Sequence, residues 1–237
     1  ADNNMGFVVK YGDVSDDIQV LQKISTINNC IGNYVKSHLE LEKNHKEVGN
    51  FIIMEYMDGE LTNYIKNNDP LEFDNIYCTF KEILNHLICF SSNGLLYTDL
   101  KSQNILYKCY QQNKKLEISF GDLGSFAIKK DNILIKSGVF TYSPPSKKNN
   151  YISPNNISEK DIVWCLGVVT IELFLTSLYI RDFYYDRMEY KTDKNIELLV
   201  SESLENIKKK YANNLNTHFF INNILTGILS VNEEKRL

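Results

Sequence analysis

The chain has 237 residues, of which 43% are hydrophobic and 24% charged, as is ordinary for a globular protein with a substantial core. Its formal net charge of −4 argues against a dedicated nucleic-acid surface, and no apolar run is long enough to cross a membrane as a helix. The five cysteines are widely spaced and lack a C-x-x-C pair, which indicates reduced thiols and a cytoplasmic or, as second choice, nuclear location. The richness in Asn, Ile, Lys and Tyr suggests an A/T-rich genome of parasitic or viral type, and a viral protein would act in the host cell.

The first quarter of the chain predicts strands around one helix. Runs of β-favouring residues indicate the strands, whereas Ile18, Leu21 and Ile24 recur at the spacing of one helical face. In chain order we expect a strand, a helix and two strands over residues 6–11, 14–24, 30–42 and 50–56.

The rest of the chain predicts a mainly helical body. Apolar residues at helical spacing end at Asn93-Gly94, a favourable helix C-terminus, and a nearly continuous apolar run predicts a buried central helix. The expected helices cover residues 60–66, 75–93, 162–178, 195–211 and 217–229. Residues 125–160 contain one glycine and three prolines and are expected to be irregular.

The most informative stretch reads Y-T-D-L-K-S-Q-N-I-L, from Tyr97 to Leu106. Within it, Asp99 can accept the proton of an attacking hydroxyl, and Lys101 can neutralise charge on a moving phosphoryl group. Asn104, together with the aspartate of the later Asp122-Leu123-Gly124, can hold magnesium through oxygen atoms. This set of side chains suits phosphoryl transfer from a metal-bound nucleotide.

The order and spacing of these residues resemble the loops H-R-D-L-K-x-x-N and D-F-G of eukaryotic-type serine/threonine protein kinases, with Tyr97 and Thr98 in place of the family's His and Arg. The resemblance implies an α+β, two-lobed protein-kinase-like fold. Residues 1–56 would form a reduced, β-rich N-lobe and residues 57–237 a mainly helical C-lobe. It also implies ATP and Mg²⁺ as cofactors and a protein substrate with Ser or Thr hydroxyls. We expect no nucleic-acid or membrane partner, and the C-lobe could bind other proteins.

Two further segments resemble the nucleotide-binding parts of the same family. The run Val8-Val9-Lys10 is similar to the V-A-I-K strand, whose lysine pairs with the α- and β-phosphates. The run from Met54 to Leu61 is similar to the hinge M-E-Y-x-x-G-x-L, where backbone groups recognise adenine. The resemblance therefore implies the following nucleotide contacts: Lys10 for the phosphates, Met54 as gatekeeper, Glu55 and Met57 in the hinge, Glu60 at the ribose and Leu106 beneath the adenine.

Three positions depart from the pattern of the family. The nearest match to the helix glutamate that pairs with the strand lysine is Asp17, which is shorter and close to Lys10 in sequence. Ser146 replaces the glutamate that normally pairs with an arginine matching Arg236, so we expect Arg236 to lack its buried acid and the C-lobe to pack less well. Asp161 is one residue away from the position of the family's aspartate, but it can still cap its helix and brace the catalytic loop.

Two other departures concern activity. Only nine residues precede Lys10 and they contain one glycine, so we expect the family's glycine-rich hairpin over the phosphates to be absent from this stretch. Thr98 removes the arginine that binds a phosphorylated activation segment, so we expect no switching by phosphorylation of that segment.

The sequence leaves three functions open. The first is a serine/threonine protein kinase, supported by Asp99, Lys101, Asn104 and Asp122 occurring together, although we expect poor or no activity from these 237 residues alone. The second is an impaired pseudokinase that acts as a binding decoy or scaffold, supported by the departures above. A small-molecule kinase is the third, and Lys101 argues against it because such enzymes usually lack this lysine.

Overall fold

The computed structural model of the chain describes residues 7–11, 18, 20, 35–39, 51–110, 115–130, 133–134, 142, 144–145, 157–176 and 193–237. Ile18 and Val20 are helical and buried, within the helix expected over residues 14–24. Asp17 and Ser146, on which two expectations depend, lie outside the described residues.

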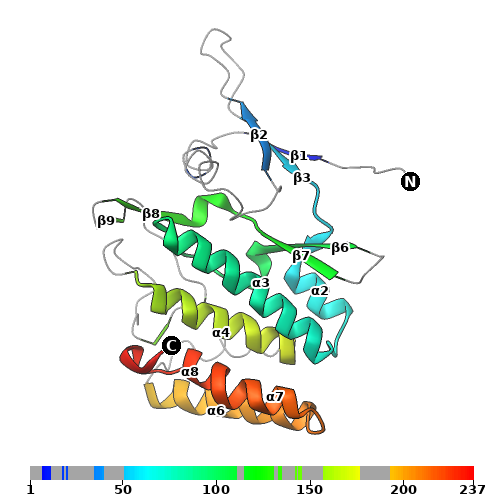
Figure 1. Cartoon of the computed structure of the whole chain (residues 1–237), viewed down its shortest axis with the longest axis vertical. Helices are drawn as coiled ribbons and strands as arrows, with labels where there is room; N and C mark the ends of the chain where they lie inside the picture. Colours follow the sequence, from blue (N-terminus) through cyan, green and yellow to red (C-terminus); the bar gives the residue numbers. More distant parts are fainter. Residues whose placement is uncertain are drawn as a thin grey trace.

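An antiparallel sheet at one end of the molecule contains β1 (Phe7–Tyr11), β2 (Val35–Leu39) and β3 (Phe51–Glu55), with β3 in the middle (Figure 1). The three strands fall within the segments expected from sequence. Ile52 and Met54 alternate on β3 and are both buried, as the two-residue period of a strand requires.

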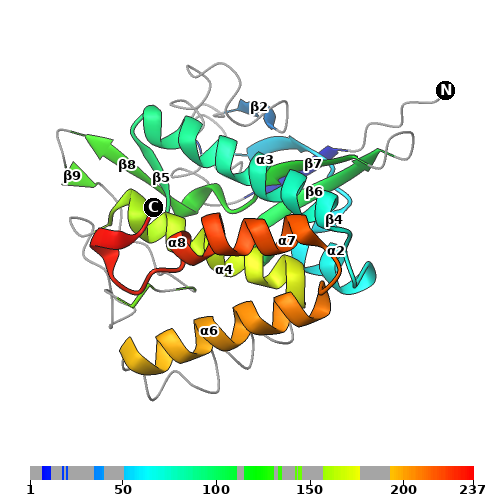
Figure 2. The same ribbon diagram turned by 60° about the horizontal axis from the view of Figure 1, so that its bottom comes forward.

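The opposite end of the molecule is helical, with α3 and α4 in its middle and α6, α7 and α8 beyond them (Figure 1). Helix α4 contacts α3, α6 and α8, and Figure 2 shows α6 along the outer edge of this group. The helices are α2 (Leu61–Asn67), α3 (Phe73–Ser92), α4 (Glu159–Leu175), α6 (Asp193–Lys210), α7 (Leu215–Phe220) and α8 (Thr226–Ile228). The α+β, two-lobed kinase-like fold expected from sequence is confirmed, whereas the division after residue 56 stays a prediction.

The ends of α3 and α4 follow from local chemistry. Helix α3 ends at Asn93, and Gly94 then takes φ 70°, the left-handed conformation that glycine adopts most easily. Helix α4 begins three residues before the expected Ile162, because Ser158 and Asp161 form a capping box that adds a turn. Nearly every residue of α4 is buried, as its apolar run predicts.

The helix expected over residues 217–229 is interrupted by a π-helical turn, η5 (Ile221–Leu225), between α7 and α8. The wider turn displaces the regular hydrogen bonds, and the Thr226 hydroxyl donates to the carbonyl of Ile221 at 2.8 Å. Further on, the helix packs closely on α4, since a Cβ at Gly167 would lie 2.7 Å from the Ile228 side chain.

Short strands between the two ends carry the loops of interest. One sheet pairs β4 (Gly59–Glu60), β6 (Ile105–Tyr110) and β7 (Lys115–Phe120), and another pairs β5 (Leu95–Tyr97), β8 (Phe126–Lys130) and β9 (Ile133–Leu134). The loop from β5 to β6 contains the first motif, and the loop from β7 to β8 contains the second. Edge-to-face contacts join the Tyr97 ring, at the start of the first loop, to Phe120 and Phe126 on either side of the second, so the bases of both loops share one packed cluster.

Candidate active site

The first loop brings together three residues that the sequence analysis singled out. The carboxylate of Asp99 accepts hydrogen bonds from Lys101 Nζ at 2.5 Å and Asn104 Nδ2 at 3.0 Å, both at Oδ2. Asn104 Nδ2 also donates to the Asp99 carbonyl at 3.0 Å. A 3₁₀ turn over Ser102–Asn104, closed by the Asn104 amide on the Lys101 carbonyl at 3.0 Å, creates this convergence. The carboxylate of Asp99 is thus held in a fixed orientation, with its side chain 15% exposed.

The second loop lies directly against the first. The Gly121 amide donates to the Asn104 carbonyl at 2.8 Å, which places the next residue, Asp122, beside the Asn104 loop. Asp122 has φ 45° and ψ 67°, a left-handed conformation that costs a non-glycine residue on the order of 1 kcal/mol. Ser125 supports this conformation, because its amide donates to the Asp122 carbonyl at 2.9 Å and its hydroxyl to Asp122 Oδ2 at 2.6 Å.

Tyr97 and Thr98, which replace the family's His and Arg, are both buried and both join the loops. The Tyr97 hydroxyl donates to the Gly121 carbonyl at 2.7 Å, and its ring packs edge-on against Phe120. Thr98 donates twice to the Ser125 carbonyl, from its amide at 2.9 Å and from its hydroxyl at 2.7 Å.

The segment from Met54 to Leu61, which resembles the hinge, is hydrogen-bonded to β6. The Asp58 amide donates to the Tyr107 carbonyl at 2.9 Å, and Asp58 Oδ2 accepts from the Cys109 amide at 2.8 Å. The carboxylate of Glu55 forms an ion pair with Lys108, a pairing that the sequence analysis missed. The Glu55 side chain is therefore engaged by β6, and the expected contact of this residue with adenine stays a prediction.

The other residues expected at the nucleotide surround this segment. Met54 is buried on β3 and Met57 is half-buried. The exposed Glu60 lies opposite Leu106 in the pairing of β4 with β6, so the expected ribose and adenine contacts are neighbours. Lys10 is half-buried on β1, opposite Ile52, and its contact with phosphates stays a prediction.

A buried polar group on α4 was not expected from sequence. Glu172 is 1% exposed, and its Oε1 accepts from the Tyr142 hydroxyl at 2.6 Å. The Cys165 thiol, two turns earlier on the same face of α4, donates to the Tyr142 carbonyl at 3.3 Å. Burial raises the pKa of Glu172 to about 7, and the hydrogen bond from Tyr142, with Ser102 close by, limits the rise. In the sequence, Glu172 is a single acid within the long apolar run of α4, and this position could have indicated a buried polar group.

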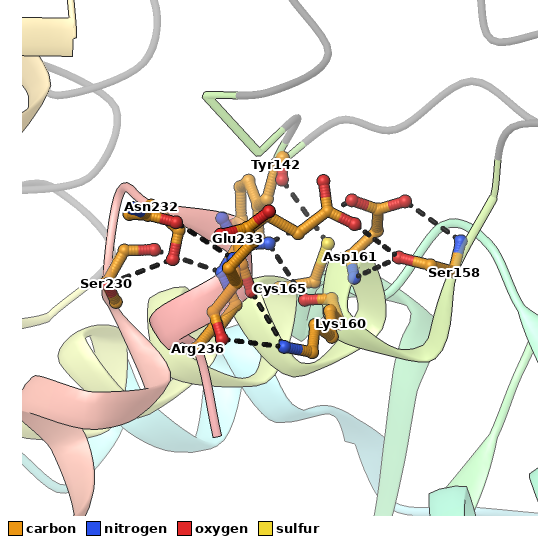
Figure 3. Close-up of polar contacts among 10 residues, drawn as sticks. Tyr142, Ser158, Lys160, Asp161, Cys165, Ser230, Asn232, Glu233 and Arg236 are labelled. Atoms are coloured by element: carbon orange, nitrogen blue, oxygen red, sulfur yellow. Dashed lines mark hydrogen bonds and ion pairs between the residues drawn. The ribbon is translucent and has the colours of Figure 1, made fainter.

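Arg236 is buried beside an acid of α4. Its guanidinium lies 3.9 Å from Asp161 Oδ1, and both side chains are fully buried (Figure 3). The guanidinium also stacks over the Trp164 ring, 5.2 Å from its centroid. Its hydrogen bonds go to the carbonyls of Ser230 and Lys160, each at 3.0 Å. The expectation concerned an acid at position 146, which lies outside the described residues, whereas the added turn of α4 places a different buried acid, Asp161, beside Arg236.

The cysteines differ in state. Cys78, Cys109 and Cys165 are free. Cys89 takes part in a disulfide, so the expectation of reduced thiols throughout is wrong at that residue. Burial raises the pKa of the Cys165 thiol well above its ordinary value, which keeps it protonated as the donor to Tyr142.

Two features are absent from the part of the chain that the structure describes. Among these residues, no three His, Cys, Asp or Glu side chains gather closely enough to hold a metal ion by themselves. Nor does any helix described here have the length and apolar character needed to cross a membrane.

Comparison with known proteins agrees with the resemblance. The chain is 32% identical over 164 residues to the probable serine/threonine-protein kinase mkcE of Dictyostelium discoideum, a match that covers 67% of this chain and 20% of that protein. It is 28% identical over 150 residues to the serine/threonine-protein kinase shk1/pak1 of Schizosaccharomyces pombe, covering 59% and 21% respectively. It is 22% identical over 236 residues to the serine/threonine-protein kinase TIO of Arabidopsis thaliana, covering 98% and 16%.

The chain thus spans about a fifth of the length of these relatives. The family model described as "Protein kinase domain" matches residues 5–237, almost the whole chain. Together with the two adjoining loops and the two-lobed fold, this match shows that the chain belongs to the protein kinase domain family.

Proposed function

We propose that this chain is the catalytic domain of a serine/threonine protein kinase that transfers the γ-phosphate of ATP to protein hydroxyls. One observation carries the proposal. Asp99 is held between Lys101 and Asn104, and the carbonyl of Asn104 bonds directly to the residue before Asp122. The names of the relatives, all serine/threonine-protein kinases, support the same substrate class.

The donor atoms fit Mg²⁺ bound together with a nucleotide. Asn104 directs its amide nitrogen to Asp99, so its side-chain oxygen is the atom that a cation would meet. Asp122 accepts the Ser125 hydroxyl at Oδ2, and its other carboxylate oxygen could bind the cation. Two protein oxygens suffice, because Mg²⁺ commonly completes its shell with phosphate oxygens and water. When bound, Mg²⁺ would neutralise charge on the β- and γ-phosphates.

The residues of the chain then take the following roles. The substrate hydroxyl attacks the γ-phosphorus, its proton passes to the Asp99 carboxylate, and the bond to the β,γ-bridging oxygen breaks to release ADP. Lys101, which lies against Asp99, neutralises charge on the phosphoryl group in transit. Lys10 would orient the phosphates, while the backbone along Glu55 and Met57 would receive adenine above Leu106.

A phosphotransfer assay tests the proposal. The full-length protein is incubated with radiolabelled ATP, Mg²⁺ and a mixed Ser/Thr substrate such as dephosphorylated casein, beside Asp122→Ala and Asp99→Asn. We expect each substitution to lower the rate at least about a hundredfold, because each removes a group that acts in the transition state. Equal labelling by wild type and Asp122→Ala would leave the binding module, a decoy or scaffold, as the function.

A further inference from the structure

Ser125 lies at the centre of the connection between the two loops. Its hydroxyl donates to Asp122 Oδ2 at 2.6 Å, a short hydrogen bond of the charge-assisted kind, and its amide donates to the Asp122 carbonyl at 2.9 Å. These two bonds fix both the backbone turn and the carboxylate of Asp122. They also leave the other carboxylate oxygen of Asp122 pointing away from Ser125.

Thr98 holds Ser125 from the other side. The single carbonyl of Ser125 accepts both the amide and the hydroxyl of Thr98, at 2.9 and 2.7 Å. Thr98 is 2% exposed, so water cannot replace these bonds cheaply. Thr98 is also the residue directly before Asp99. The proton acceptor of the first loop is therefore linked to the carboxylate of the second through two side-chain hydroxyls.

We propose that Thr98 and Ser125 are positioning residues that fasten Asp122 to the catalytic loop and hold its carboxylate ready for the metal without any phosphate on the chain. We call this pair the Thr98–Ser125 clamp. The inference rests on the proposed function, since it assumes that Asp122 meets a divalent cation with the nucleotide.

The conformation of Asp122 explains why a clamp is needed. Its left-handed backbone, φ 45°, is unfavourable for aspartate and persists only where the surroundings impose it. In the family pattern an arginine occupies the position of Thr98 and binds a phosphorylated activation segment. Here the side chain at that position instead bonds directly to the backbone beside the Asp122 turn, so order in this loop comes from the fold.

The test measures metal binding rather than turnover. The full-length protein is treated with phosphatase, and Mg²⁺ is titrated in the presence of a fluorescent ADP analogue to find the concentration that gives half-maximal binding. The variants are Ser125→Ala and Thr98→Val, which remove one hydroxyl each with little change of volume. Ser125→Thr and Thr98→Ser restore a hydroxyl. Ser230→Ala is the matched control, because it removes a hydroxyl that bonds a backbone carbonyl far from the loops.

We expect Ser125→Ala to raise the half-maximal Mg²⁺ concentration about tenfold and Thr98→Val about threefold, as the loss of one hydrogen bond each would predict. Ser125→Thr, Thr98→Ser and Ser230→Ala should stay within about twofold of wild type, and phosphatase treatment should not change wild type. Hydrogen exchange of residues 121–126 without metal should be faster in Ser125→Ala and Thr98→Val only.

The clamp and the proposed function fail in different ways. The clamp alone is overturned if wild type binds the ADP analogue in an Mg²⁺-dependent way and Ser125→Ala and Thr98→Val leave the half-maximal Mg²⁺ concentration unchanged or lower it. A wild type that needs phosphorylation for this dependence also overturns it. A wild type that binds no nucleotide under any Mg²⁺ concentration overturns the proposed function and with it the positioning role.

Discussion

Helix α4 buries two carboxylates in opposite ways. Asp161, in its first turn, is matched by the cation of Arg236 at 3.9 Å and accepts the Ser158 amide at 2.9 Å. Glu172, three turns further on, accepts the neutral hydroxyl of Tyr142 at 2.6 Å and has Ser102 close by, and no cation contacts it among the described residues. Its second oxygen, Oε2, has no hydrogen-bond partner among the described residues.

The difference shows what burial demands of an acid. A carboxylate can remain charged in a dry interior where a cation and backbone N–H groups surround it, and the N-terminal end of a helix adds its own favourable dipole. Without these partners the protonated form is favoured, which is why the pKa of Glu172 rises to about 7. The same helix thus contains one buried acid that faces a cation and one buried acid whose pKa is raised to about 7.

The largest effect should come from breaking the ion pair. We expect Asp161→Ala to lower the free energy of unfolding by about 3–5 kcal/mol, because it leaves the buried Arg236 guanidinium without a counter-charge. Chemical denaturation of the purified protein measures this loss. Asp161→Asn, which keeps the cap but removes the charge, separates the two contributions.

A double substitution sharpens the same point. Replacing both partners, Asp161→Asn with Arg236→Met, should cost less than Asp161→Ala alone, since no unpaired charge remains inside. If the double variant is less stable than wild type by the sum of the losses of Asp161→Asn and Arg236→Met, the two residues do not interact and Arg236 is held by Ser230, Lys160 and Trp164 instead.

The second effect concerns pH. The pKa of Glu172 is raised from 4.5 to about 7 on folding, so the folded protein holds a proton that the unfolded chain has lost between these values. Below pH 4.5 Glu172 is protonated in both states and does not lower the free energy of unfolding. As pH rises from 4.5 to about 7, this residue lowers the free energy of unfolding by about 3 kcal/mol in all. Above pH 7 this loss stays constant.

Glu172→Gln isolates this contribution, because the amide keeps the shape and an acceptor for Tyr142 but cannot ionise. The variant should match wild type near pH 4.5 and be the more stable protein at pH 8. Unfolding free energies of both proteins across that range give the difference directly, with other titrating groups cancelling. Parallel curves would mean that Glu172 ionises as easily in the folded protein as in the unfolded one.

The sequence predicted the two loops well because their information is local. Asp99, Lys101 and Asn104 lie within six residues of each other in one loop. The strands β6 and β7 follow this loop, and their antiparallel pairing returns the chain to Asp122 beside it. What joins the loops was not predicted. In the sequence, the clamp residue Ser125 looks like any polar loop residue. Its role depends on the left-handed backbone of Asp122, which the sequence pattern does not predict.

The buried groups on α4 escaped prediction for a different reason. Apolar residues surround this helix on every side, so its pattern does not indicate which way Glu172 points. For Asp161 the sequence predicts a role in capping the helix, which the structure confirms, but it does not predict the contact with Arg236. The disulfide at Cys89 and the ion pair of Glu55 with Lys108 depend on distances through space that spacing along the chain does not encode.

The smallest effect should come from the cap that corrects the start of α4. Ser158 accepts the Asp161 amide at 3.3 Å and donates its hydroxyl to Glu233 at 3.1 Å, so it joins the helix start to the segment that carries Arg236. Ser158→Ala should lower the free energy of unfolding by about 1 kcal/mol, the usual loss for a cap, and Ser158→Thr should recover most of it. Thermal unfolding of the three proteins at one pH measures this. A loss as large as that of Asp161→Ala would mean that the cap, rather than the cation of Arg236, decides whether Asp161 is held in place, and the contrast with Glu172 would then rest on helix geometry instead of charge.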